Sequence, residues 1–250
     1  MFLAIFDQAS RRIALGKRQS QKSRYNHTFG GGEEYLGLAS GNRRTPVHLL
    51  FRINTDDPFV RVDLGGTKYL PLLCAIRYGA CDLGYQVVSD DEIKIFHMEE
   101  SKEWDGFPRD NYPQTLPIEN IGIVSDQYDP SNAEDALFYA GVFGFDHLTG
   151  KQMENVRRLV VEKGMYQPGG ETIDEFLEMV SMPFVQGPPV DDCPNPDCEN
   201  HGRESSLRTL AIFNEAPDRA GGLWGSMADL QIIHQICPCC ATIRTTSQCT

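Results

Sequence analysis

The stretch VHLLFRINTDDPFVRVDL, residues 47–64, decides the fold class, because it joins two apolar β-type runs through the turn signal Asp56-Asp57-Pro58. A short run rich in β-branched and aromatic residues that ends at Asp, Gly or Pro is typical of a strand followed by a turn. Three more runs of this kind follow, at residues 69–76, 85–88 and 92–98. Residues 47–98 are therefore predicted to form a meandering β-sheet, followed by a long loop over residues 99–120.

Outward from this sheet, three helix-start signals follow one another between residues 131 and 181. The segments 131–134 (SNAE), 149–152 (TGKQ) and 172–175 (TIDE) each place Ser or Thr three residues before Glu or Gln. This is the pattern of a capping box, and apolar residues at helical spacing follow each one. Together with the sheet, these helices predict an α+β body over residues 47–182 that is β-rich and has a helical middle segment.

The first 46 residues are predicted to be a flexible, basic N-terminal arm. The chain has a net charge of −12, yet residues 1–52 contain nine Lys or Arg against three acidic residues. Residues 17–24 are polar and basic, and Gly30-Gly31-Gly32 is typical of a flexible joint. Such an arm could contact phosphate, an acidic partner or the acidic body itself, whereas the body disfavours nucleic acid.

Cysteine usage and hydropathy bear on the compartment. No apolar run approaches the roughly 20 residues that cross a bilayer, and the apolar start at residues 2–6 is too short for a signal-peptide core. A cytoplasmic protein with no membrane partner is therefore expected. Six of the eight cysteines fall in the last 58 residues, and in a reducing compartment this clustering favours metal binding over disulfides.

Two cysteine pairs predict a structural zinc site. Cys193 and Cys198 have C-x4-C spacing, and Cys237 and Cys240 have C-x2-C spacing. Structural zinc takes four ligands in a tetrahedron, delivered as two local pairs from turns, and four thiolates would leave no position for an activated water. Residues 183–250, with strand candidates at 207–213, 227–236 and 242–245, are therefore predicted to be a zinc-binding, zinc-ribbon-like β segment.

The ligand set has two alternates. His201 follows Cys198 at a spacing that would let it replace Cys193 or Cys198. Cys239 could likewise compete with Cys240 for the metal. A catalytic site would have to use the histidines, such as His97 or His147, and the sequence contains no nucleophile elbow, Walker loop or His-Glu-x-x-His motif.

The order of several short motifs resembles the bacterial YwqG-like family. These motifs are Leu64-Gly65-Gly66, Pro183-Phe184-Val185-Gln186-Gly187, Cys193, Cys198, Trp224-Gly225 and Cys237. The chain is also distantly similar to the eukaryotic programmed-cell-death and ribosome-maturation proteins, which escort a ribosomal protein. The resemblance covers residues 59–98 and 183–249, implies a chaperone-like binding role on a β-rich scaffold, and supplies no catalytic residues.

Three functions remain open at this point. The favoured one is a non-catalytic protein-binding or assembly module, which takes another protein as its partner. The first alternative is nucleic-acid binding through the basic arm and the zinc turns, although the sequence pI of about 4.9 disfavours it. The second alternative is a metal-dependent hydrolase, which would need an open coordination position on the metal.

Overall fold

The structure is a computed structural model that describes most of the 250-residue chain and divides it into two compact units. Unit 1 comprises residues 1–125 and 189–250, and unit 2 comprises residues 126–188. The described residues are 2–7, 12–31, 36–39, 43–75, 82–98, 115–125, 129, 131–167, 169–180, 189–214 and 230–249. None of the described helices is long and apolar enough to cross a lipid bilayer.

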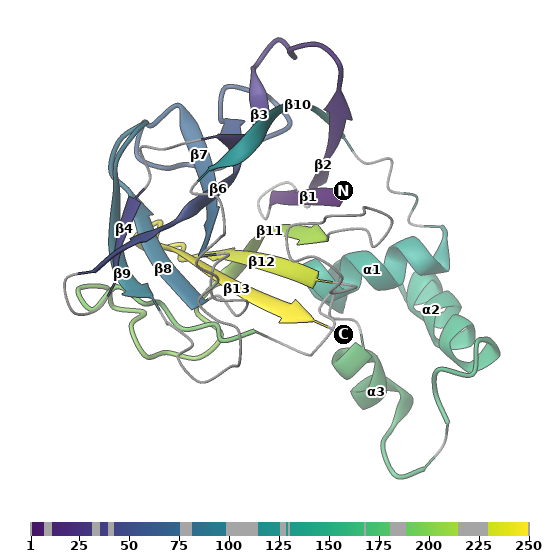
Figure 1. Ribbon diagram of the computed structural model, residues 1–250. Coiled ribbons are helices and arrows are strands. Elements are labelled where there is room, and N and C mark those ends of the chain that lie inside the picture. The colour runs from purple at the N-terminus through teal and green to yellow at the C-terminus, as the bar shows by residue number, and fades with distance from the viewer. Residues whose placement is uncertain are drawn as a thin grey trace. The chain divides into compact units, whose positions relative to one another are not determined.

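Unit 1 is built on a strongly curled antiparallel sheet (Figure 1). Over the described residues the sheet has 11 strands in the order β7-β6-β3-β10-β2-β1-β11-β12-β13-β8-β9. The strands are β1 (Phe2–Asp7), β2 (Arg12–Gln19), β3 (His27–Gly31), β6 (His48–Asn54), β7 (Tyr69–Cys74), β8 (Asp82–Val87), β9 (Ile93–Met98), β10 (Leu116–Ser125), β11 (Arg208–Asn214), β12 (Leu230–Ile236) and β13 (Ile243–Cys249). A separate hairpin pairs β4 (Leu36–Ala39) with β5 (Arg43–Pro46).

The curl brings strands that are distant in the sheet order into contact across the core. The ring of Phe51 on β6 packs edge-to-face against Phe29 on β3 and against Phe213 on β11. At the ends of the sheet, the Tyr85 hydroxyl on β8 donates to the carbonyl of Pro71 on β7 at 2.7 Å. Side chains on the concave face therefore bury one another, which is how a single sheet can enclose a core.

The prediction of a flexible arm over residues 1–46 is wrong for the described part of that segment. β1, β2 and β3 lie inside the sheet, and β1 pairs with both β2 and β11. Leu3 and Ile5 are fully or almost fully buried in the main core. The basic residues of β2 did not prevent strand formation, because exposed and buried positions both occur along this strand.

The predicted boundary at residue 183 also differs from the structure. β11, β12 and β13 are not a separate C-terminal element, because they join the main sheet between β1 and β8. Two strand assignments change as well. The run 59–64 forms no strand but buries Val60 and Leu64, and β10 begins at Leu116, inside the segment expected to be a loop.

Unit 2 is the helical middle segment, and it is a minor part of a β-rich chain. Its helices are α1 (Ala133–Phe143), the 3-10 helix η2 (Phe145–His147), α2 (Gly150–Glu162) and α3 (Ile173–Val180). They enclose a small core of Ala136, Val156, Val160, Phe176 and Leu177. The helical middle of the predicted α+β body is thus present as its own unit.

Two of the three predicted capping boxes are present in the structure. Thr149 and Gln152 form a capping box at α2, and Thr172 and Glu175 exchange the equivalent bonds before α3. At α1 the expected cap, Ser131, is not the N-cap. Asn132 takes that position, and its side chain accepts from the Glu134 and Asp135 amides.

Candidate metal centre

The first pair of predicted ligands lies on a turn that precedes β11. The Cys198 amide donates to the Asn195 carbonyl at 3.1 Å, and the Cys193 amide donates to the Asn200 carbonyl at 3.3 Å. Within the turn, the Asn195 side chain accepts from the Asp197 amide at 3.0 Å. These local bonds bend residues 193–200 so that two thiols from one short segment face the same side.

The second pair lies on the tight turn between β12 and β13. The Cys237 amide donates to the Thr242 carbonyl, and the Ala241 amide donates to the Cys237 carbonyl, both at 2.9 Å. Ala241 closes the turn with a φ of 54°, a left-handed backbone conformation that the surrounding bonds must hold in place. The turn aims the Cys237 and Cys240 thiols at a common point.

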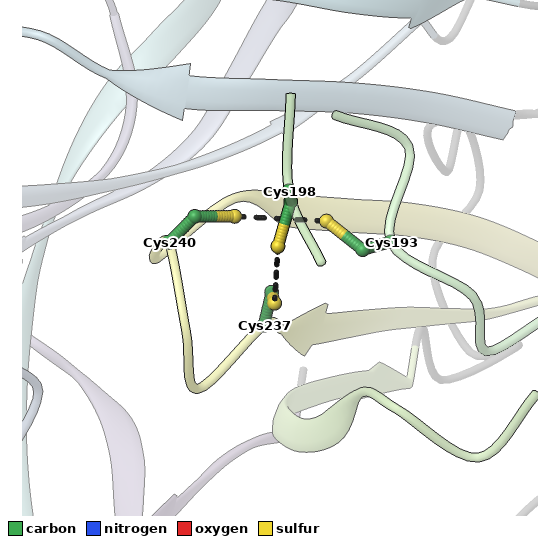
Figure 2. Close-up of side chains that lie close together, drawn as sticks. All are labelled: Cys193, Cys198, Cys237 and Cys240. Atoms are coloured by element: carbon green, nitrogen blue, oxygen red, sulfur yellow. Dashed lines mark hydrogen bonds between the residues drawn. The ribbon is translucent and has the colours of Figure 1, made fainter. Parts of the chain in front are cut away.

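The two turns bring their four sulfurs together, as Figure 2 shows. The sulfurs of Cys193 and Cys240 are 3.6 Å apart, those of Cys198 and Cys237 are 3.7 Å apart, and all four lie within 4.8 Å of one another. Zinc–sulfur bonds of about 2.3 Å in a tetrahedron place the sulfurs roughly 3.8 Å apart. The cluster could therefore hold a metal ion with little rearrangement.

The structure separates these four residues from the two alternates. The ring of His201 is turned toward the backbone, with Nδ1 2.8 Å from the Cys193 carbonyl oxygen. The Cys239 thiol is exposed and lies 3.2 Å from the Glu199 carboxylate. Among the described residues, neither His201 nor Cys239 belongs to the cluster of four.

The surroundings of the thiols shift their proton affinities in opposite directions. Burial raises the pKa of the Cys193 thiol above its ordinary value. Burial also acts to raise the pKa of Cys240, but hydrogen bonds with the side chain and backbone of Thr242 and with the Cys198 and Cys193 thiols together outweigh it and lower that pKa to about 7. Metal binding must displace the remaining thiol protons, so metal affinity is expected to rise with pH.

Asn200 supplies donors around the sulfurs. Its amide donates to the Cys198 sulfur and its side-chain nitrogen donates to the Cys237 sulfur, each at 3.5 Å. Such donors stabilise thiolate charge and orient the ligands. Sequence reasoning missed Asn200, although its position inside the Cys198-Glu-Asn-His201 segment is the kind of signal that could have indicated it.

Arg244 ties the first turn to the sheet. From β13 its guanidinium binds Asp82 of β8 with two bonds of 2.8 and 2.6 Å, and it also binds the carboxylate of Asp192, next to Cys193. Burial acts to lower the pKa of Arg244, but the two carboxylates outweigh it and raise the pKa. The arginine stays charged. Its bidentate pair with Asp82 fixes the guanidinium on the sheet, and its third nitrogen donates to Asp192 and so holds that residue against the sheet.

A close backbone approach fixes the same turn from a second side. A Cβ placed on Gly84 of β8 would lie 2.5 Å from Cγ of Pro194. Only glycine leaves room for this proline to pack on the strand. The Gln86 side chain, two residues further along β8, donates to the Cys240 carbonyl at 2.7 Å, so β8 supports both turns.

The other candidate residues do not form a catalytic constellation in the described part of the chain. His97 Nε2 lies 3.3 Å from Asp82, whose carboxylate is already bound by Arg244. The side chain of His147, together with Trp224 and Cys81, lies outside the described residues. Sequence reasoning missed a buried pair, in which His27 Nε2 lies 2.9 Å from Asp57 while Nδ1 accepts from the Asn54 amide.

A second buried histidine, His234 on β12, makes stability depend on pH. Its Nδ1 lies 2.8 Å from the Thr245 hydroxyl, and burial lowers its pKa from 6.5 to about 3. Because the folded pKa lies below the unfolded one, the unfolded chain takes up the proton first. The stabilisation is complete above pH 6.5 and is lost as pH falls toward 3, which amounts to about 2 kcal/mol between pH 7 and pH 5.

Urea unfolding at the two pH values, followed by the circular dichroism of the sheet, measures this effect. His234→Asn removes the titrating group but keeps a polar atom near the Thr245 hydroxyl. We expect this variant to lose about 2 kcal/mol less than the wild type between pH 7 and pH 5. Equal losses in the two proteins would show that His234 does not stay neutral in the folded state.

Comparison with models of protein families, with curated proteins and with solved structures finds no match for this chain, so its resemblance to the YwqG-like family stays a prediction.

Proposed function

We propose that this chain is a non-catalytic protein-binding module, of the assembly or chaperone-like kind, and that a structural zinc ion fastens its C-terminal turns. The observation that carries the proposal is the cluster of Cys193, Cys198, Cys237 and Cys240, with all sulfurs within 4.8 Å. Thiolates are soft ligands that select zinc among the common divalent ions of cells. Four of them close a tetrahedral shell, which favours a structural role over a hydrolytic one.

Zinc at this position would act as a cross-link. It would join the turn at residues 193–200 to the β12–β13 turn, and 38 residues separate Cys198 from Cys237. Closing a loop of this length costs conformational entropy, which the metal–thiolate bonds offset. The chain's own residues then hold the two turns against β8 through Arg244, Gly84 and Gln86, so the surface around the centre would be rigid and suited to binding a partner.

Metal analysis of purified variants tests the ligand set. The wild type should contain about one zinc ion per chain after dialysis. Cys193→Ser and Cys240→Ser should retain almost none, because a hydroxyl is a poor replacement for a thiolate ligand. Cys239→Ser and His201→Ala are matched controls with full zinc expected. Full zinc in Cys193→Ser and Cys240→Ser would overturn the ligand set.

The binding role needs its own comparison. Wild-type protein, Cys239→Ser and Cys240→Ser serve as baits in cell extract, and a partner protein should be captured by the first two and lost with the third. A second readout addresses the hydrolase alternative. If the cobalt-substituted protein changes its visible spectrum when cyanide is added, the metal has an open position and the non-catalytic assignment fails.

A further inference from the structure

A recess in unit 1, with a volume of about 460 Å³, lies on the sheet strands that the sequence assigned in part to a flexible arm. Its lining includes Lys22, Asn26, Thr28, Arg52, Tyr69 and Asn120. The volume falls in the range of about 300–1,000 Å³ that is usual for small-molecule sites. None of the four clustered cysteines lines this recess, so the inference is independent of the proposed metal centre.

Strand register brings the polar residues of the recess into one row. Asn120 on β10 pairs with Thr28 on β3, and Thr28 pairs with Arg52 on β6. Directly opposed residues of neighbouring strands point to the same face of a sheet. The other face carries Phe29 and Phe51, the sequence neighbours of Thr28 and Arg52, which pack into the core. The row therefore lies on strands whose opposite face is packed into the core, which keeps these residues in fixed positions.

Two cations line the recess, and the described residues place no matching anion beside them. The Arg52 guanidinium lies 3.9 Å from the centre of the Tyr69 ring, and its buried Nε has no hydrogen-bond partner in the described part of the chain. Among the described residues, neither Arg52 nor Lys22 is in a salt bridge, and no carboxylate lines the recess. A partly buried arginine with an unused donor is costly unless something accepts from it, since buried polar groups are normally hydrogen-bonded.

The remaining lining suits an oxyanion that carries an organic group. The amides of Asn26 and Asn120 and the hydroxyl of Thr28 can donate further hydrogen bonds. Leu49, Ile118 and the Tyr69 ring supply apolar surface beside them. The whole chain carries a net charge of −12, so a recess with two cations that are unpaired among the described residues is a local reversal of the charge that would otherwise repel anions.

We infer that this recess binds a small phosphate ester. The Arg52 guanidinium donates hydrogen bonds to two phosphate oxygens, and Lys22 supplies a second positive charge at the rim. A phosphate monoester carries about −1.5 to −2 charges at neutral pH, which matches the two cations better than a monoanionic carboxylate does. The Asn and Thr donors bind the third oxygen and the ester oxygen, and the organic group packs on the apolar wall.

Isothermal titration of the purified full chain with phenyl phosphate at low salt tests this inference. Binding should be saturable, tighter than that of inorganic phosphate, which lacks the apolar group, and tighter than that of benzoate, which carries one charge. Arg52→Gln should weaken phenyl phosphate binding about 10- to 100-fold, as expected for the loss of charge-assisted hydrogen bonds. Lys22→Gln should weaken it roughly threefold, because this lysine is exposed.

Arg12→Gln is the matched control, because it removes the same charge from an exposed position at the far end of β2. It should change the affinity less than twofold. Lys22 is exposed, so Lys22→Gln keeps the test valid if Arg52→Gln fails to fold. Three results would each overturn the assignment: no phenyl phosphate binding, benzoate or inorganic phosphate bound as tightly, or equal weakening by Lys22→Gln and Arg12→Gln.

Discussion

For the zinc site that we propose, treatment of the purified protein with a strong chelator is expected to lower its melting temperature by about 8–16 °C. Zinc held at about 1,000 times its dissociation constant stabilises a folded chain by roughly 4 kcal/mol. For a chain of 150–250 residues, 1 kcal/mol corresponds to about 2–4 °C in melting temperature. The sheet should remain folded without the metal, because its main core is formed by residues outside the cysteine cluster.

The loss should be local, and hydrogen exchange locates it. Without the metal, Cys193, Cys198, Cys237 and Cys240 are four thiols in close contact, with only Leu207 as a further buried apolar residue of their cluster. Amides of residues 193–201 and 237–242 should therefore exchange faster after chelation, while those of β3 and β6 keep their protection. Cys239→Ser should behave like the wild type, and unchanged exchange at residues 193–201 would contradict the cross-link.

The clustering of the four cysteines was largely predictable because its decisive features are local. Each cysteine pair lies on one short turn, and the spacing of Cys237 and Cys240 determines how two thiols can face one point. The choice between Cys193 and His201 was not predictable, because it depends on the backbone bond that turns the His201 ring away. The contact by which Arg244 holds the first turn against the sheet was not predictable either, because its partner Asp82 lies 162 residues away in the sequence.

For the fold, too, the predictions that depended on residues close in sequence succeeded, and those that depended on distant residues failed. The capping boxes at Thr149 and Thr172 use residues three apart, and these predictions are confirmed. The N-terminal strands were missed, because β1 is stabilised by pairing with β11 some 200 residues later in the chain. A basic and glycine-rich composition is typical of a flexible segment, but long-range pairing and burial outweigh that tendency.

Phe51→Ala is expected to destabilise unit 1 by about 3–5 kcal/mol, the usual cost of truncating a fully buried aromatic ring. Phe51 is fully buried, and its ring centre lies 5.3 Å from that of Phe29 and 5.1 Å from that of Phe213. β6 and β11 are separated by four strands in the sheet order, so this contact exists only because the sheet curls. The substitution would leave a cavity at the point where the curl closes.

Urea unfolding of unit 1, followed by circular dichroism in the β region, measures this loss of stability and compares it with the loss in two further variants. Phe51→Leu should cost less, about 1–3 kcal/mol, because it mainly removes two ring pairs worth about 0.5–1.5 kcal/mol each. Phe59→Ala, at a position 44% exposed, should cost within about 0.5 kcal/mol. If Phe51→Ala were no more costly than Phe59→Ala, β6 and β11 would not share a core, and the sheet would not be curled as described.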